Sequence, residues 1–172
     1  MRKFSTKDLT LAAMVAAVYA ALTLLLPIPQ YGEVQFRIAE CMTVLPFLFP
    51  WATPGLIVGC FLANLLGSPY VLDWVFGTLA TALACFLTAK MPSKWLAPLP
   101  PVLCNAVIVG GEIAYSMSEG FGGAFWSLYG FNALSVGFGE LVVCYVLGLV
   151  LLASLPKIKA FQDLIPEKRL SI

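Results

Sequence analysis

Several acidic side chains and amides lie within the long apolar stretches of this 172-residue sequence. Glu112 and Glu140 are the clearest cases, because they fall inside expected helices and no basic residue lies inside any helix to neutralise them. Charged groups are expensive at membrane depth, so an acidic group there indicates a functional site. Carboxylates form strong, charge-assisted hydrogen bonds with N–H donors, which favours binding of a cationic or donor-rich ligand.

Other polar and aromatic residues are spaced to join these acids. Asn105 and Glu112 are two helical turns apart on one face, and Tyr115 follows on the same side. Arg37 and Glu40 have the spacing of a helical ion pair. The alternative is a purely structural role, in which these groups satisfy one another between helices. We expect a substrate pocket, open to the outside, formed by Gln35, Arg37, Glu40, Asn64, Asp73, Trp74, Asn105, Glu112, Tyr115, Asn132 and Glu140.

The sequence lacks the residues and motifs that usually carry out catalysis. There is no histidine, no GxxxxGK[ST] phosphate loop, no nucleophile paired with a base and no cluster of metal ligands. The five cysteines lie in apolar stretches without a CxxC motif, which is typical of small packing residues. A net charge of +1 provides no basic patch for nucleic acid. We expect a binding protein and not an enzyme, with no metal or cofactor bound by this chain.

The composition is that of a membrane protein. Hydrophobic residues make up 60% of the chain and charged residues 11%, against about 25% charged in a typical soluble domain. We predict an all-α integral membrane protein in which residues 1–172 form a single membrane domain with six transmembrane helices. The second and third spans are short and could instead form one re-entrant hairpin. The expected ranges are 8–27, 38–50, 54–68, 71–90, 99–116 and 131–154.

The basic residues in the connections predict the orientation. Arg37 alone falls on the outer side of the expected topology. The run from Leu9 to Pro27 is long enough to span, so we interpret it as the first helix and not as a cleaved signal peptide. Both termini are therefore expected in the cytoplasm, together with Arg2, Lys3, Lys7, Lys90, Lys94, Lys157, Lys159, Lys168 and Arg169.

Small residues recur at four-residue spacing in the first and third expected helices. Such stripes let helix backbones approach closely. In the third helix the stripe is Gly55, Gly59, Ala63 and Gly67, and internal packing is its expected role. The first helix has a broader face, which we expect to dock on a partner protein, made of Ala12, Ala13, Ala16, Ala17, Ala20 and Ala21. Its two stripes, 12/16/20 and 13/17/21, cannot both face outward, so one of them is expected to pack internally.

The loop from Pro27 to Gln35 joins the first two helices on the outer side. It holds Gly32, which permits bending, and Tyr31, which is able to cover a flat ring. We expect Tyr31, Gly32 and Glu33 to form a lid over the pocket.

Along its whole length the chain resembles the substrate-binding S component of an energy-coupling factor (ECF) vitamin transporter. The shared features are an alanine-striped first helix, six short spans and the lack of an energy-coupling motif. Two segments resemble the queuosine-precursor transporter (QueT) family more specifically: Val34–Glu40 with Thr43–Pro46, and Gly59–Leu65 followed by Asp73. The resemblance implies an S-component-like bundle and a 7-deazaguanine substrate, with the 7-aminomethyl form favoured. It also implies a membrane coupling protein that docks on the first helix, and two cytoplasmic ATPases that use ATP.

The acidic pocket itself agrees with such a ligand. 7-Aminomethyl-7-deazaguanine carries an ammonium group and adjacent N–H donors that carboxylates accept, whereas an anionic vitamin needs the opposite charge. Amides suit its carbonyl and ring nitrogens. Two alternatives stay open. One is another ligand on the same scaffold, such as riboflavin or cationic thiamine, and the other is a self-sufficient proton-coupled carrier that uses Glu112 and Glu140. The expected location is the bacterial cytoplasmic membrane, with several passes through the bilayer.

Overall fold

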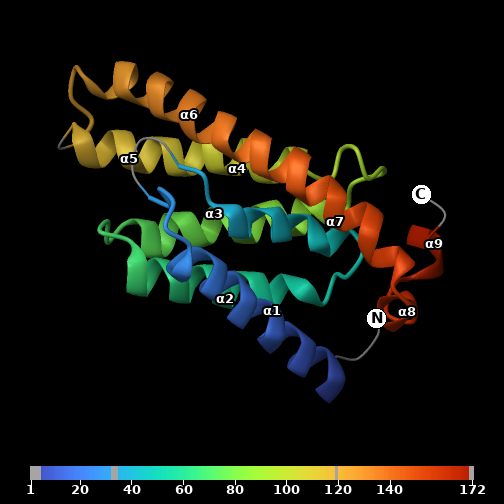
Figure 1. Cartoon of the computed structure of the whole chain (residues 1–172). Coiled ribbons are helices and arrows are strands. Elements are labelled where there is room, and N and C mark those ends of the chain that lie inside the picture. The colour runs from blue at the N-terminus through green and yellow to red at the C-terminus, as the bar shows by residue number, and fades with distance from the viewer. Residues whose placement is uncertain (1–4, 32–34, 119, 171–172) are drawn as a thin grey trace.

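The computed structural model describes residues 5–31, 35–118 and 120–170 (Figure 1), and all regular elements among these residues are helical. The all-α class is therefore confirmed, and the apolar helices agree with a membrane protein. Three helices of the described chain are long and apolar enough to cross a membrane: Thr6–Leu25, Leu99–Met117 and Phe125–Lys157. Three more are apolar but shorter: Ile38–Phe47, Ala52–Gly67 and Asp73–Thr88.

Helix α1 (Thr6–Leu25) has clear start and stop signals in the sequence. Ser5 is its N-cap. The Asp8 amide donates to the Ser5 hydroxyl over 3.2 Å, and the Ser5 amide donates to the Asp8 carboxylate over 2.9 Å. This reciprocal capping box satisfies two amides that the first turn leaves free. The helix ends before Pro27, because the residue preceding a proline disfavours helical geometry.

Helix α2 (Ala52–Gly67) packs closely against α1 along its glycines. A Cβ atom added at Gly55 would collide with the backbone carbonyl of Ala12. One added at Gly59 would lie 2.8 Å from the carbonyl oxygen of Ala16, which is too close for a side chain. The predicted internal packing of this glycine stripe is confirmed at these two positions.

The second helix differs from the expected α-helix over residues 38–50. It is a 3₁₀ helix, η1 (Ile38–Phe47), and it contains Pro46, which cannot donate an amide hydrogen bond. A 3₁₀ helix rises about 2.0 Å per residue, so η1 covers roughly 20 Å, less than the thickness of a bilayer core. It packs against α1, α2 and α3 and against the last long helix, and residues 39–49 are buried. η1 is therefore the centre of the bundle.

Two long helices contain π-helical turns. Helices α4 (Leu99–Cys104) and α5 (Gly110–Met117) are joined without a break by the π turn η2 (Asn105–Val109). Helices α6 (Phe125–Val142) and α7 (Leu149–Ser154) are joined in the same way by η3 (Val143–Gly148), and a 3₁₀ turn, η4 (Leu155–Lys157), follows. The expected start of the last helix at residue 131 was wrong, because Gly130 lies inside α6 and not before it.

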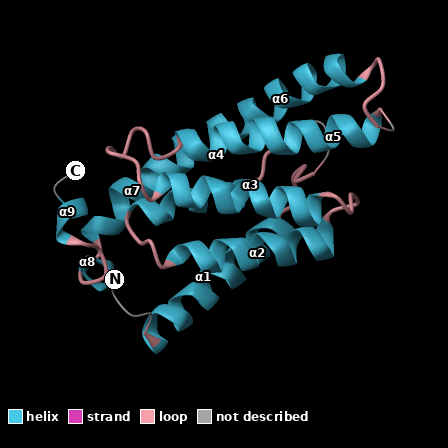
Figure 2. Ribbon diagram, turned by 180° about the vertical axis from the view of Figure 1, so that it is seen from behind, coloured by secondary structure: helices cyan, strands magenta, loops and turns pink. Residues whose placement is uncertain are grey.

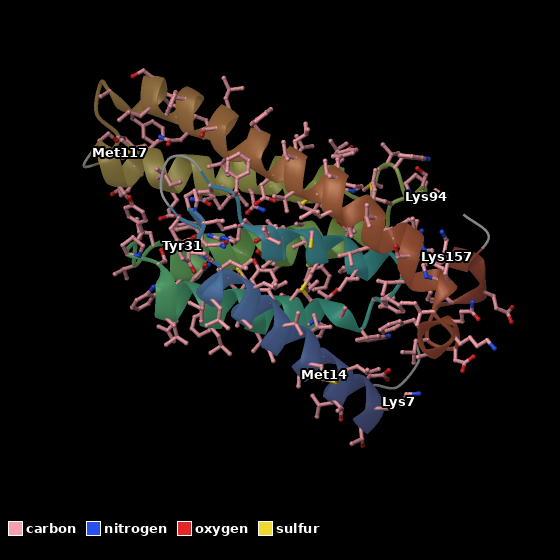
Figure 3. All side chains as sticks on the ribbon, viewed as in Figure 1. Lys7, Met14, Tyr31, Lys94, Met117 and Lys157 are labelled. Atoms are coloured by element: carbon pink, nitrogen blue, oxygen red, sulfur yellow. The ribbon has the colours of Figure 1, made fainter. Side chains whose placement is uncertain are left out.

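The helices run roughly along one long axis, with the α5–α6 connection at one end of the molecule (Figures 1 and 2). The start of α1 and the short helices α8 (Lys159–Gln162) and α9 (Glu167–Leu170) lie at the opposite end. Figure 3 shows Lys7, Lys94 and Lys157 at this second end, and Tyr31 and Met117 at the first. The remaining helix, α3 (Asp73–Thr88), packs against α2, α4 and η1.

Many polar side chains are buried inside the bundle, and many large apolar side chains are exposed on its surface. Leu66 and Leu134 are 71% and 77% exposed, whereas Asn64 and Glu40 are completely buried. This inverted distribution suits a protein surrounded by lipid, in which a polar side chain is tolerated only where it faces protein or a cavity.

Candidate functional site

Arg37 lies at the centre of a buried polar cluster. Its two terminal guanidinium nitrogens lie 3.7 Å from Glu40 Oε1 and 3.6 Å from Asp73 Oδ2. Its Nε donates to the backbone carbonyl of Gln30 over 3.4 Å. The expected pairing of Arg37 with Glu40 is confirmed. The contact with Asp73 further joins the start of η1 to the start of α3.

Glu40 connects three elements of the fold. One carboxylate oxygen accepts a hydrogen bond from the hydroxyl of Tyr19 in α1. The backbone carbonyl of Glu40 accepts from the Thr43 hydroxyl over 2.5 Å and from the Cys144 thiol of η3 over 3.5 Å. The second carboxylate oxygen of Glu40 is buried and has no partner among the described residues.

Asp73 is held at the start of α3 by a contact from α2. The side-chain amide of Asn64 donates to the backbone carbonyl of Asp73 over 3.0 Å. A Cβ atom at position 77 would collide with the Asp73 carboxylate, so Gly77 leaves the space that this carboxylate occupies. Asp73 and Asn64 each keep one buried side-chain oxygen without a partner in the described chain.

Glu140 reaches the same region from the last long helix. It is 6% exposed, and the Cys144 thiol donates to its carboxylate over 3.5 Å. Its charge interacts with those of Glu40 and Arg37, and the side chain of Asn105 faces it from the start of η2. The cluster is therefore built from α1, η1, α2, α3 and both π-containing helices.

Glu112 joins this cluster to a large cavity. It is 6% exposed, its charge interacts with those of Asp73 and Arg37, and neither carboxylate oxygen has a partner among the described residues. The cavity has a volume of about 780 Å³ and lies between α3 and the α5–α6 pair. Apart from Glu112 its walls are apolar or aromatic. The aromatic side chains are Phe76, Tyr115, Phe121, Phe125, Trp126 and Tyr129.

The arrangement is chemically suited to a ligand with N–H donors. The Arg37 guanidinium pairs with the carboxylates of Glu40 and Asp73 and interacts electrostatically with Glu112 and Glu140. Buried polar atoms are nearly always hydrogen-bonded, and here the carboxylates of Glu40, Asp73 and Glu112 all keep unpartnered acceptors. In the part of the chain that the structure describes, no three His, Cys, Asp or Glu side chains are grouped to hold a metal. The site therefore favours a cationic, donor-rich organic molecule with a flat ring.

The remaining predicted pocket residues lie at its edge or outside it. The ring nitrogen of Trp74 is buried without a partner in the described chain. The backbone carbonyl of Gln35 lies directly against Gly139 of α6. Asn132 is fully buried, but its amide donates within α6 and toward the Met117 sulfur, 3.7 Å away. Asn132 thus connects α6 to α5, and neither of its hydrogen bonds in the described chain is to the Arg37 cluster.

Tyr31 is the part of the expected lid that the structure describes. Its hydroxyl donates to the backbone carbonyl of Ala63 over 2.8 Å, and the Arg37 guanidinium lies 5.0 Å from the centre of its ring. Burial raises the pKa of Tyr31 to about 12, so the hydroxyl stays protonated and remains a donor at neutral pH. Gly32 and Glu33 lie outside the described residues.

The alanines of α1 lie on two sides of the helix, one that packs inside the bundle and one that is exposed. Ala12 and Ala16 are 4% and 7% exposed and pack on the glycines of α2, and Ala20 is partly buried. The stripe that packs internally is therefore Ala12, Ala16 and Ala20, and the expected docking role is wrong for these three alanines. On the other side of α1 the alanines are exposed: Ala13, Ala17 and Ala21.

Sequence reasoning missed several members of the cluster. Tyr19 was overlooked, although it is the one tyrosine within the alanine-rich first helix. Cys60 and Cys144 were interpreted as packing residues. Both are buried and free, but Cys60 accepts from Thr81 over 3.2 Å and Cys144 donates to Glu140. No spacing rule points to the contacts of Tyr19 and Cys60, because each joins elements distant in the sequence. Glu140 and Cys144 are four residues apart, and this helical spacing could have indicated their contact.

Comparison with known proteins gives two matches. The family model described as QueT transporter matches residues 9–157. The chain is also 34% identical over 83 residues to the queuosine precursor transporter QueT of Lactococcus lactis subsp. cremoris (strain MG1363). That alignment covers 47% of this chain and 48% of the relative, about half of each. No solved structure matches the chain.

Proposed function

The chain belongs to the QueT transporter family, and from that membership we propose that it is the substrate-binding S component of an ECF-type importer. It captures a queuosine precursor outside the cell, either 7-aminomethyl-7-deazaguanine or a related 7-deazaguanine. The name of the Lactococcus relative supports this class of substrate. The fold supports a transport role because its polar groups gather inside an apolar bundle.

The observation that carries the proposal is the position of Glu112. Its two unpartnered carboxylate oxygens lie between the aromatic cavity and the Arg37 cluster. Aromatic side chains cover the flat deazaguanine ring, and the carboxylates accept from its ammonium group and N–H donors. Four carboxyl groups surround this region and Arg37 is its one basic group among the described residues, which disfavours an anionic ligand.

The proposal includes six membrane crossings with both termini in the cytoplasm of a bacterial cell. Nine of the ten basic residues fall on the inner side of this arrangement. The shared position of Lys7, Lys94 and Lys157 at one end of the bundle supports it. η1 is short for a crossing, and Arg37, which is extended directly before it, adds to its reach.

ATP-driven uptake requires partners, because the sequence has no phosphate-binding loop of its own. The exposed stripe Ala13, Ala17 and Ala21 docks on a membrane coupling protein, and two cytoplasmic ATPases supply the energy. The segment that holds Tyr31, together with Gly32 and Glu33, closes over the bound substrate.

Competition binding to the purified protein tests the choice of ligand. 7-Aminomethyl-7-deazaguanine should bind more tightly than the neutral 7-cyano form, because only the former carries the ammonium group. Thiamine, which is cationic but has a different ring, should compete weakly. Equal affinity for the amino and cyano forms would contradict the ammonium–carboxylate contact, and tighter binding of thiamine would contradict the deazaguanine.

Transport assays in vesicles separate the S component from a self-sufficient carrier. Vesicles that contain this chain alone should take up no substrate under a proton gradient. Uptake should appear when the coupling protein, the ATPases and ATP are added. Proton-driven uptake by the chain alone would instead favour a carrier that uses Glu112 and Glu140 as proton relays.

A further inference from the structure

A second cavity, of about 320 Å³, lies at the opposite end of the molecule from Met117 (Figure 3). Its apolar wall is formed by the end of η1 and the end of α7, including Phe47, Leu48 and Leu152. Three basic side chains from three separate segments complete it: Lys94, Lys157 and Arg169. No acidic residue lines this cavity among the described residues.

Arg169 is fixed in this cavity by neutral groups only. Its two terminal guanidinium nitrogens donate to the backbone carbonyls of Met91 and Ala89, each over 2.7 Å. The guanidinium carbon lies 4.3 Å from the centre of the Phe47 ring. These contacts hold the guanidinium group in place but leave its positive charge without a negative partner in the described chain.

Lys94 and Lys157 add two further positive charges. Neither forms an ion pair within the described residues. Positive charges that line the same cavity repel one another, and an anion bound between them offsets this electrostatic repulsion. The cavity is thus an electropositive hollow with an ordered guanidinium group on one side and apolar side chains on the other.

We propose that this cavity binds the phosphate of an anionic phospholipid headgroup. The membrane position rests on the topology proposed above, which places this end at the cytoplasmic surface. Trp95, next to Lys94, is 64% exposed, as is typical of side chains at a membrane–water interface. Val150 of the preceding turns of α7 is 59% exposed and offers an apolar surface to an acyl chain. Basic pockets on the cytoplasmic side of helical bundles are suited to such headgroups.

Titration of the purified full-length chain with dihexanoyl-phosphatidylglycerol tests the site. Dihexanoyl-phosphatidylcholine and inorganic phosphate serve as comparison probes. The double variant Lys94→Gln/Lys157→Gln should bind phosphatidylglycerol roughly thirtyfold more weakly than wild type, because each basic group near an anionic lipid contributes about a factor of five. The control variant Lys7→Gln/Lys159→Gln removes the same charge from exposed positions outside the cavity, and its binding should match wild type.

Each other outcome contradicts the proposal. Equal binding of phosphatidylcholine would show that the net negative charge of the headgroup is not recognised. Competition by inorganic phosphate at equal concentration would assign the site to a free anion. Unchanged binding by Lys94→Gln/Lys157→Gln would place the lipid elsewhere. Loss of coupling-protein binding by this variant, with lipid binding retained, would assign the cavity to an acidic partner side chain. The charge-preserving variant Lys94→Arg/Lys157→Arg should restore lipid binding, which separates charge loss from misfolding.

Discussion

The hydroxyl of Tyr19 donates a hydrogen bond to the carboxylate of Glu40, and both side chains are completely buried. This contact ties α1 to η1, and the Arg37 pairs extend the connection to Asp73 at the start of α3. The helix that carries the exposed alanine stripe is therefore linked directly to the polar cluster.

Replacing Tyr19 by Phe should destabilise the protein by about 1–3 kcal/mol, because a buried carboxylate loses its donor while the ring still packs. Thermal unfolding in detergent measures the change. Tyr145→Phe is a matched control, since no hydrogen bond of the Tyr145 hydroxyl is seen in the described chain. An equal shift in both variants would show that the Tyr19 hydroxyl has no special role.

Asp73→Asn should cost about 3 kcal/mol of unfolding free energy. The substitution leaves the buried Arg37 guanidinium without one of its two ionic partners, and breaking a buried pair from one side is expensive. Denaturant unfolding measures this cost, with the exposed Asp163→Asn as control. If Asp73→Asn lowered the free energy of unfolding no more than Asp163→Asn does, Glu40 alone would be sufficient to neutralise Arg37.

Glu112→Gln, unlike Asp73→Asn, should weaken ligand binding without lowering stability. Its carboxylate oxygens have no partner among the described residues, so the variant should keep wild-type stability. Affinity for 7-aminomethyl-7-deazaguanine should fall about thirtyfold or more, since a buried charged contact is worth about 2–5 kcal/mol. Glu140→Gln should also weaken binding, and the exposed Glu167→Gln should not. Wild-type binding by the variants at 112 and 140 would return both acids to a structural role.

Gly55→Ala should destabilise the protein by about 1–3 kcal/mol, because the added Cβ collides with the Ala12 backbone and forces α1 away from α2. Gly130→Ala provides the reverse case. No heavy atom lies within 4 Å of its added Cβ, so the better helix propensity of alanine should stabilise α6 by about 1 kcal/mol. Melting temperatures of the two variants should move in opposite directions, and a parallel shift would contradict the close α1–α2 contact.

Ala17→Trp should fold and bind substrate but abolish uptake, because the bulky ring lies on the exposed side of α1 where close backbone approach to the coupling protein is needed. Ala16→Trp should instead disrupt folding, since Ala16 packs against Gly59. Co-purification with the coupling complex, run beside a binding assay, separates these effects. Normal transport by Ala17→Trp would place the docking surface elsewhere.

The positions of the helices could be predicted because apolar runs are bounded by prolines and glycines. Pro27 ends α1, and Pro54 lies in the first turn of α2. The 3₁₀ form of η1 could not be predicted, because it depends on burial among several helices. The start of α6 was missed because Gly130 has the sequence appearance of a helix boundary.

The acidic site was predictable in its composition but not in its pairing. Glu112 and Glu140 were predicted because they are acidic residues within apolar helices. The Arg37–Glu40 pair was predicted from its helical spacing. The contacts of Asp73 with Arg37 and of Tyr19 with Glu40 join distant segments, and no local rule gives them. Asn132 shared the polarity of the site residues, but its position in the bundle separates it from the cluster.

The π turn η2 lies directly before the segment that holds Glu112 and Tyr115. A π turn uses i→i+5 bonds and so contains more residues than an α turn. If the same residues wound as a regular α-helix with none deleted, every later side chain would rotate by about 100° around the helix. Glu112 and Tyr115 would then leave the cavity without any change in their identity. A homologue with one residue fewer between Asn105 and Val109 should therefore wind as a regular α-helix there and still hold its equivalents of Glu112 and Tyr115 in the cavity.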